Sequence, residues 1–133
     1  MILWATLLSL FFLASPVASE SIVVLSGNVS CHLDREYSYR IQITKVESPI
    51  AKVLIMSPLK RTSQTVSPYE AIFRISDDGF SRKAKLTAYV AHNCHKSNKQ
   101  VTARYNLGMF TFTEKLQHVT YNFDITNEGK GPK

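Results

Sequence analysis

The chain has 133 residues, with 16 Lys or Arg against 10 Asp or Glu and a formal net charge of +6 at pH 7. Removing the 19 residues of the N-terminal segment described next leaves 114. That length allows one domain with a modest core and excludes a second domain.

The N-terminal segment has the layout of a signal peptide. Residues 2–14 form an apolar run that only Thr6 and Ser9 interrupt, and small residues follow it. The run is shorter than the roughly 20 residues of a membrane-spanning helix, and Pro16 ends it. Val17-Ala18-Ser19 places small residues where signal peptidase needs them. We therefore expect residues 1–19 to be removed and a secreted chain to start at Glu20, with a retained anchor as the alternative.

The two cysteines, Cys31 and Cys94, both lie in the expected mature chain. An even number of cysteines in an oxidising compartment predicts one disulfide, with two free thiols as the alternative. Closing this loop would add about 4 kcal/mol to the stability by the chain-entropy argument. Asn28-Val29-Ser30 is a sequon, so Asn28 is a candidate glycosylation site. Because it lies in a predicted strand beside Cys31, a glycan there would have to point outward.

Eight segments rich in β-branched or aromatic residues predict strands. In chain order they are residues 22–31, 37–44, 53–56, 71–75, 86–92, 101–105, 109–113 and 119–125. The segments that begin at Tyr37 and Val119 alternate apolar and polar residues, as a half-buried antiparallel strand does. Asp77-Asp78-Gly79 and Asn106-Leu107-Gly108 predict turns, and the polar segment from Pro58 to Pro68 predicts a long loop.

This spacing of short strands predicts an all-β domain over residues 20–126, either an antiparallel β-sandwich or a barrel. The residues that follow, 127–133, contain two glycines, a proline and two lysines but no apolar side chain. They are therefore expected to form a disordered C-terminal tail.

Four segments resemble nematode transthyretin-like proteins. Val23 to Cys31 is similar to the family's opening strand, with its V-x-V-x-G-x-x-x-C pattern, and Leu86 to Cys94 is similar to the strand with the partner cysteine. Asp77-Asp78-Gly79-Phe80 resembles a hairpin of the family, and Phe123-Asp124-Ile125 resembles its final strand. The resemblance implies a secreted, prealbumin-like sandwich. It also implies binding roles, which in some members are thought to be phosphatidylserine bridging or parasite effector functions. An immunoglobulin-like sandwich is the alternative fold.

Catalytic motifs are missing from the chain. The related hydroxyisourate hydrolases end in Tyr-Arg-Gly-Ser, whereas this chain ends at residues 129–133 in Gly-Lys-Gly-Pro-Lys. No Gly-x-Ser-x-Gly, His-Glu-x-x-His or phosphate-binding glycine loop occurs in it. We expect a protein that is not an enzyme and that carries no cofactor.

Three histidines would approach one another if the disulfide forms: His32, His92 and His95. Imidazoles gathered at one point could hold Zn²⁺ or Cu²⁺. Strand alternation, however, places His92 and His95 on opposite faces. Histidines packed around a disulfide are the commoner case, and we expect no metal. An enzyme with an unfamiliar site is the alternative if the three converge in a cleft.

The positive charge indicates an anionic partner. Basic residues follow the Asp-Asp-Gly turn and the second cysteine, at Arg82, Lys83, Lys85, Lys96 and Lys99. We expect loops at one end of the sandwich to bring them to an anionic extracellular partner, a phospholipid surface, a sulfated glycan or a receptor, rather than to nucleic acid. Solvated charge that only keeps the domain soluble is one alternative. Another is a secreted carrier of a small apolar ligand held at a dimer interface. The sequence does not specify the oligomeric state.

Overall fold

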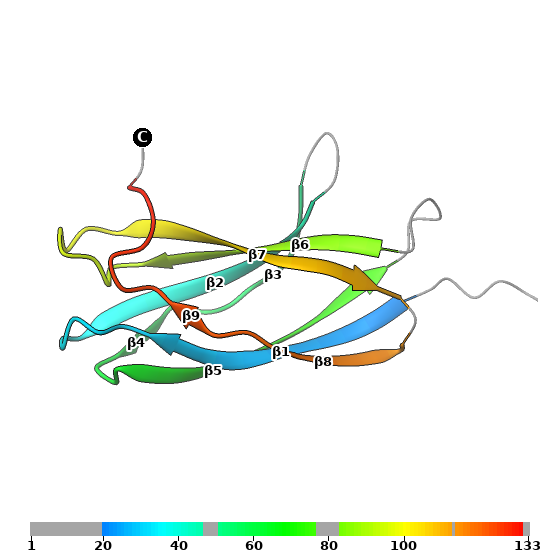
Figure 1. Cartoon of the computed structure of the whole chain (residues 1–133), viewed down its shortest axis with the longest axis horizontal. Coiled ribbons are helices and arrows are strands. Elements are labelled where there is room, and N and C mark those ends of the chain that lie inside the picture. Colours follow the sequence, from blue (N-terminus) through cyan, green and yellow to red (C-terminus); the bar gives the residue numbers. More distant parts are fainter. Residues whose placement is uncertain (1–19, 47–50, 77–82, 113, 132–133) are drawn as a thin grey trace, which may run out of the picture.

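The computed structural model describes residues 20–46, 51–76, 83–112 and 114–131. This part of the chain contains nine strands and no helix (Figure 1). The strands are β1 (Glu20–Ser30), β2 (Tyr37–Lys45), β3 (Lys52–Met56), β4 (Lys60–Thr62), β5 (Val66–Ser76), β6 (Lys83–His92), β7 (Val101–Thr111), β8 (Leu116–Thr120) and β9 (Phe123–Asp124). The expected signal peptide, the turn at Asp77-Asp78-Gly79 with Phe80, and Arg82 lie outside the described residues.

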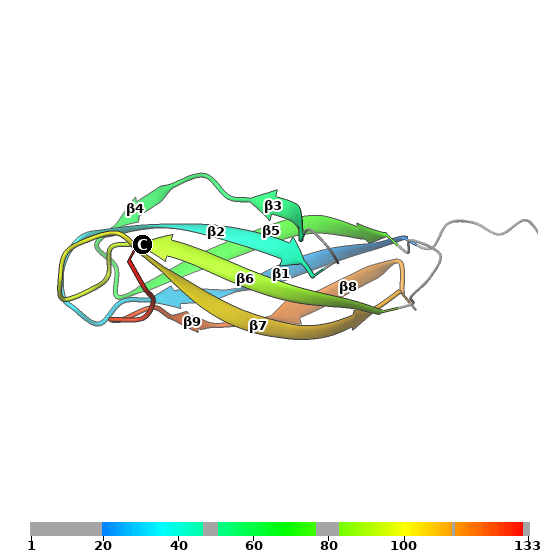
Figure 2. The same cartoon turned by 90° about the horizontal axis from the view of Figure 1, so that it is seen from above.

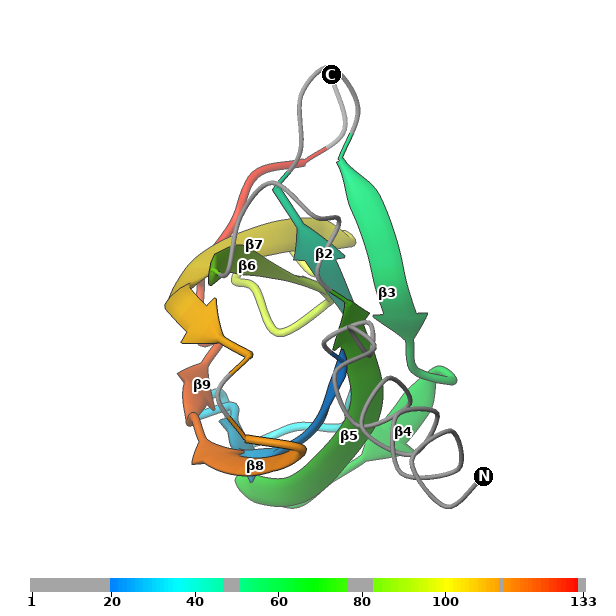
Figure 3. The same ribbon diagram turned by 90° about the vertical axis from the view of Figure 1, so that its right-hand side faces the viewer.

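The strands form two sheets that face each other as the layers of a sandwich (Figure 3). Sheet A has the order β5-β1-β8, with β9 also paired to β1, and sheet B has the order β3-β2-β6-β7, with β4 also paired to β2. The pairings are antiparallel except that β1 runs parallel to β8 and β9. The expected single-domain, all-β sandwich is confirmed, and sheet A is mixed rather than purely antiparallel.

The core lies between the sheets and follows from the alternation of side chains along the strands. On β2, Tyr37, Tyr39, Ile41 and Ile43 are all buried, as their period-two pattern predicts. The core also contains Val23, Leu25, Val29, Ala71, Phe73, Ile75 and Phe123 from sheet A, and Ile125, which follows β9. The aromatic rings of Tyr69, Tyr105 and Tyr121 extend this core around the buried Phe123.

One predicted turn is instead a bulge within a strand. The segments 101–105 and 109–113 belong largely to one strand, β7, which continues through Asn106-Leu107-Gly108. Leu107 is an extra residue at the point where the register with Leu86 and Thr87 shifts. Gly108 has a φ of 91°, a backbone conformation that glycine adopts most easily. The same residues favour a turn or a bulge, and the pairing with β6 decides between them.

Two further boundaries differ from the sequence-based prediction. The segment Pro58 to Pro68, expected to be a loop, contains β4 and the beginning of β5. The predicted strand 119–125 is divided into β8 and β9, which both pair with β1. Between them, Asn122 Oδ1 accepts a hydrogen bond from the Asn28 backbone N at 3.0 Å.

The C-terminal residues 127–131 are not a disordered tail. Lys130 and Thr102 exchange backbone hydrogen bonds of 3.1 and 3.0 Å, which add the tail to the edge of β7. The Asn127 backbone N donates to the Cys94 carbonyl at 2.9 Å. The prediction was wrong for these residues because backbone groups, rather than apolar side chains, hold them in place. Residues 132 and 133 lie outside the described residues.

Candidate functional site

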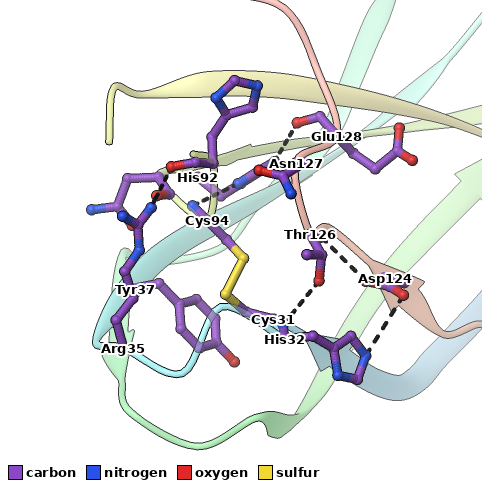
Figure 4. Close-up of a disulfide and its surroundings, with 12 residues drawn as sticks. Cys31, His32, Arg35, Tyr37, His92, Cys94, Asp124, Thr126, Asn127 and Glu128 are labelled. Atoms are coloured by element: carbon purple, nitrogen blue, oxygen red, sulfur yellow. Dashed lines mark hydrogen bonds and ion pairs between the residues drawn. A yellow bond between two sulfur atoms is a disulfide. The ribbon is translucent and has the colours of Figure 1, made fainter. Parts of the chain in front are cut away.

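The predicted disulfide is present and joins the two sheets at one end of the sandwich (Figure 4). Cys31 follows β1 and Cys94 follows β6, with their Cα atoms 6.0 Å apart and both side chains buried. Arg35 reinforces this end, because its guanidinium donates to the carbonyl oxygens of Asn93 and His95. The β6–β7 loop is therefore held in place both by the disulfide and by Arg35.

His92 is buried beside the disulfide, and both of its ring nitrogens have backbone partners. Nδ1 accepts a hydrogen bond from the Cys94 N–H at 3.0 Å, so Nε2 donates to the Glu128 carbonyl at 2.9 Å. Burial is the main cause that lowers the pKa of His92 to about 4. The hydrogen bond to the Glu128 carbonyl raises the pKa and offsets part of this effect. His92 is therefore a neutral structural side chain whose nitrogens are not available to a metal or a substrate.

The other two histidines of this end do not join His92 in a cleft. His32 is exposed and lies 3.6 Å from an Asp124 carboxylate oxygen. His95 Nδ1 lies 2.8 Å from the hydroxyl of Ser97 in its own loop. Among the described residues, no group of three or more His, Cys, Asp or Glu side chains is placed to hold a metal ion.

The depressed pKa of His92 makes the protein less stable in acid. Above pH 6.5 the ring is neutral in both states, and below this pH the unfolded state binds a proton that the folded state does not. Stability is therefore lost as the pH falls from 6.5 to about 4, by about 3 kcal/mol in total. Urea unfolding at a series of pH values measures this loss. His92→Gln, which carries no titrating ring, should show a shallower pH dependence, and equal slopes in the two proteins would contradict the assignment.

The basic residues predicted to act together lie at opposite ends of the molecule. Lys83 and Lys85 lie at the start of β6, whereas Lys96 and Lys99 lie in the loop after β6 ends at His92 (Figure 1). At about 3.3 Å per residue, the strand separates the two pairs by roughly 30 Å. These lysines therefore cannot form one contact from loops at one end, and the expected loop site is corrected in this respect.

Charge divides instead between the two sheets. The strands of sheet B contain no Asp or Glu, and their basic residues are Arg40, Lys45, Lys52, Lys60, Arg61, Lys83, Lys85 and Arg104. The strands of sheet A contain one basic residue, Arg74, together with Glu20, Glu70 and Asp124. One layer of the sandwich is thus strongly positive and the other weakly negative.

The outward side of sheet B presents this charge as a surface, which we call the basic face: Arg40, Lys83, Lys85, Tyr89 and Arg104. In the strand register, Met56, Gln42, Tyr89 and Arg104 form one row across β3, β2, β6 and β7. Side chains in such a row share one side of the sheet. Arg40 lies on the same side, two residues before Gln42, and Lys85 lies opposite Met109.

The cations of the basic face are accessible. Arg40, Lys85 and Arg104 are exposed, and within the described part of the chain none of the three forms an ion pair. Two exposed apolar side chains, Met56 and Met109, lie among them. A surface with several exposed cations and some apolar area is suited to an anionic partner.

Sequence reasoning included Lys83 and Lys85 in the predicted site but left out Arg40 and Arg104. Both arginines occupy polar positions in alternating strands, and this alternation was a signal that they point away from the core. Asn28, the candidate glycosylation residue, is half-buried on β1, which is paired on both sides. The strand alternation that buries Val29 directs Asn28 outward.

The fold and site define a β-sandwich with one disulfide and a basic outer face on one sheet. Comparisons of the chain with protein-family models, with curated proteins and with solved structures gave no match. Within the described residues, no helix is long and apolar enough to span a membrane.

Proposed function

We propose that this protein is a secreted, non-enzymatic binding module that recognises an anionic extracellular partner through the basic face. The observation that carries the proposal is the separation of charge, which places Arg40, Lys83, Lys85 and Arg104 on a layer whose strands contain no acid. Each Lys or Arg beside an anionic surface contributes about 1 kcal/mol to binding. Several on one rigid sheet therefore give useful affinity without a deep pocket.

Secretion is part of this proposal. It is supported by the apolar run of residues 2–14 and by the Cys31–Cys94 disulfide, a bond that persists mainly in oxidising compartments. The transthyretin-like relationship is also proposed. The two segments that resemble the family most closely end in Cys31 and Cys94, which are bonded to each other.

A non-catalytic role is supported by the state of the histidines. His92 is kept neutral by its burial, and both of its ring nitrogens are engaged by backbone groups. His32 and His95 face other partners, Asp124 and Ser97. A general base needs a nitrogen within reach of the substrate's proton, and His92 offers none.

The proposal is tested with two variants that change the net charge equally. The face variant combines Arg40→Glu, Lys85→Glu and Arg104→Glu, and the control combines Lys96→Glu, Lys99→Glu and Lys115→Glu. All six residues are exposed. Binding of the oxidised protein to heparin and to vesicles containing phosphatidylserine is measured over a series of salt concentrations.

We expect salt-sensitive binding to at least one probe. The face variant should bind roughly a hundredfold more weakly, since three contacts of about 1 kcal/mol are lost, while the control changes by less than about threefold. Equal losses in both variants would mean that only net charge matters. A lack of binding at low salt to both probes would overturn the proposal. Unfolding curves check that the face variant is folded.

The two apolar side chains of the basic face distinguish the classes of partner. A lipid surface can take up Met56 and Met109, whereas a sulfated glycan cannot. Met56→Ser with Met109→Ser should therefore weaken vesicle binding several-fold and leave heparin binding unchanged. If the double variant instead bound vesicles normally and heparin more weakly, a lipid surface would be excluded as the partner.

A further inference from the structure

A groove lies on one side of the sandwich, between β5 of sheet A and the stretch that joins β3 to β4. Figure 2 shows β3 and β4 following each other along this side, with the connecting segment between them. The groove has a volume of about 520 Å³, which is within the range of small-molecule sites. No described residue that lines the groove belongs to the basic face.

The groove results from how the edge of sheet B is interrupted. Ser57 ends the pairing of β3 by exchanging hydrogen bonds with Ile41: Ser57 Oγ accepts from the Ile41 N–H at 2.9 Å, and the Ser57 N–H donates to the Ile41 carbonyl at 2.8 Å. Pro58 follows and has no N–H to continue the ladder. The chain pairs with β2 again only at Lys60, opposite Tyr39. The edge is therefore open between these two points.

The inside of the groove is mainly apolar and held in shape. Pro58, Leu59 and Pro68 contribute exposed apolar surface, and the buried Ile41 and Ala71 lie beneath it. Tyr39, which also lines it, is fixed by a 2.8 Å hydrogen bond between its hydroxyl and that of Ser67. The ring of Tyr69 is fixed in the same way, because its hydroxyl donates to the Tyr121 carbonyl at 2.5 Å. A ligand would therefore meet a preformed apolar surface, which reduces the ordering that binding requires.

The rim of the groove is positive. Lys60 Nζ donates a hydrogen bond of 3.2 Å to the Pro68 carbonyl oxygen, and no ion pair among the described residues includes Lys60. An ammonium group has three donors, and this contact uses one. Arg61 is paired with Glu36 at 3.4 Å, but both side chains are largely exposed and the pair is weak. Among the described residues that line the groove, Glu70 is the one acid, and it disfavours a second negative charge on the ligand.

We infer that this groove binds a small amphipathic monoanion, an acyl or aryl carboxylate. Its apolar body would lie against Leu59, Pro68 and Tyr69, and its carboxylate would accept a hydrogen bond from Lys60 Nζ. The apolar lining accounts for the body of the ligand, and the ammonium at the rim accounts for the single charge. The site lies within one chain, so a dimer interface is not needed to form it.

The test uses decanoate as the probe and decanol as its uncharged counterpart, each titrated into ¹⁵N-labelled oxidised protein. We expect saturable binding of decanoate, with the largest amide shifts at Leu59, Lys60 and Ala71, and at least tenfold weaker binding of decanol. Lys60→Met removes the charge and keeps most of the apolar stem. It should weaken decanoate binding about tenfold, the loss of one charge-assisted hydrogen bond, and leave decanol binding unchanged.

Two controls separate this site from the basic face. Lys99→Met removes an exposed lysine outside the groove, and the face variant replaces Arg40, Lys85 and Arg104 of the basic face and keeps Lys60. Both should bind decanoate as the unmodified protein does. The inference is overturned if decanoate fails to saturate, if it shifts β6 and β7 amides instead, or if decanol binds equally well. Failure of vesicle or heparin binding would not affect this result.

Discussion

Replacing Cys31 and Cys94 with alanine should lower the free energy of unfolding by about 4 kcal/mol. The bond closes a loop with a sequence separation of 63 residues, so its loss greatly increases the freedom of the unfolded chain. It also connects the ends of β1 and β6, which belong to different sheets. Because the total stability of a domain is about 5–15 kcal/mol, this loss would leave the protein close to unfolding at 37 °C.

Urea unfolding of the double variant beside the oxidised protein measures this change. Alanine is the suitable replacement, because both positions are buried and a serine hydroxyl would lack a partner there. Reduction of the unmodified protein provides the control and should reproduce the loss. A change below about 1 kcal/mol would mean that the unfolded chain is already compact at this point or that the bond strains the fold.

Gly27→Ala should destabilise the protein by about 3 kcal/mol or more. A Cβ at this position would lie 2.1 Å from the Tyr121 carbonyl oxygen and 2.8 Å from the Tyr121 carbonyl carbon. These are backbone atoms in the link between β8 and β9, so they cannot move aside as a side chain would. The substitution would therefore push this link away from β1, where the Tyr121 N–H donates to the Ser26 carbonyl at 2.9 Å.

Gly131→Ala is the matched control, because an added Cβ there meets no atom within 4 Å. It should change the free energy of unfolding by less than about 0.5 kcal/mol. Thermal unfolding of both variants compares them directly. If Gly27→Ala were as stable as the control, the close approach of β1 to Tyr121 would not exist in solution.

Local patterns predicted much of the fold. The alternation of a strand can be read from neighbouring residues, and two cysteines allow only one pairing. The buried Tyr37, Tyr39, Ile41 and Ile43 follow directly from their spacing. Failures occurred where one sequence allows two local structures. Asn106-Leu107-Gly108 suits both a turn and a bulge, and the polar residues 127–131 suit either a free tail or a strand edge.

The candidate site was harder to predict than the fold. Sequence neighbours such as Lys83 and Lys85 were recognised as basic, but their grouping with Lys96 and Lys99 was wrong because a full strand separates the two pairs. Arg40 and Arg104 are 64 positions apart in the chain and share a face only because β2 and β7 both pair with β6. The groove likewise depends on β5 lying beside the break after β3.

The sequence by itself determined the all-β class, the disulfide and the inward and outward residues of each strand. These follow from the period of the strand and from a cysteine count that allows only one pair. The tertiary structure alone decided that positive charge collects on sheet B and that a groove opens beside Lys60. The reason is physical, because strand pairing joins residues that are far apart in the chain. The backbone hydrogen bonds that pair the strands are the same whatever side chains the residues carry, so they do not reveal in the sequence which strands will pair. Which charges become neighbours is therefore settled only when the whole core is packed.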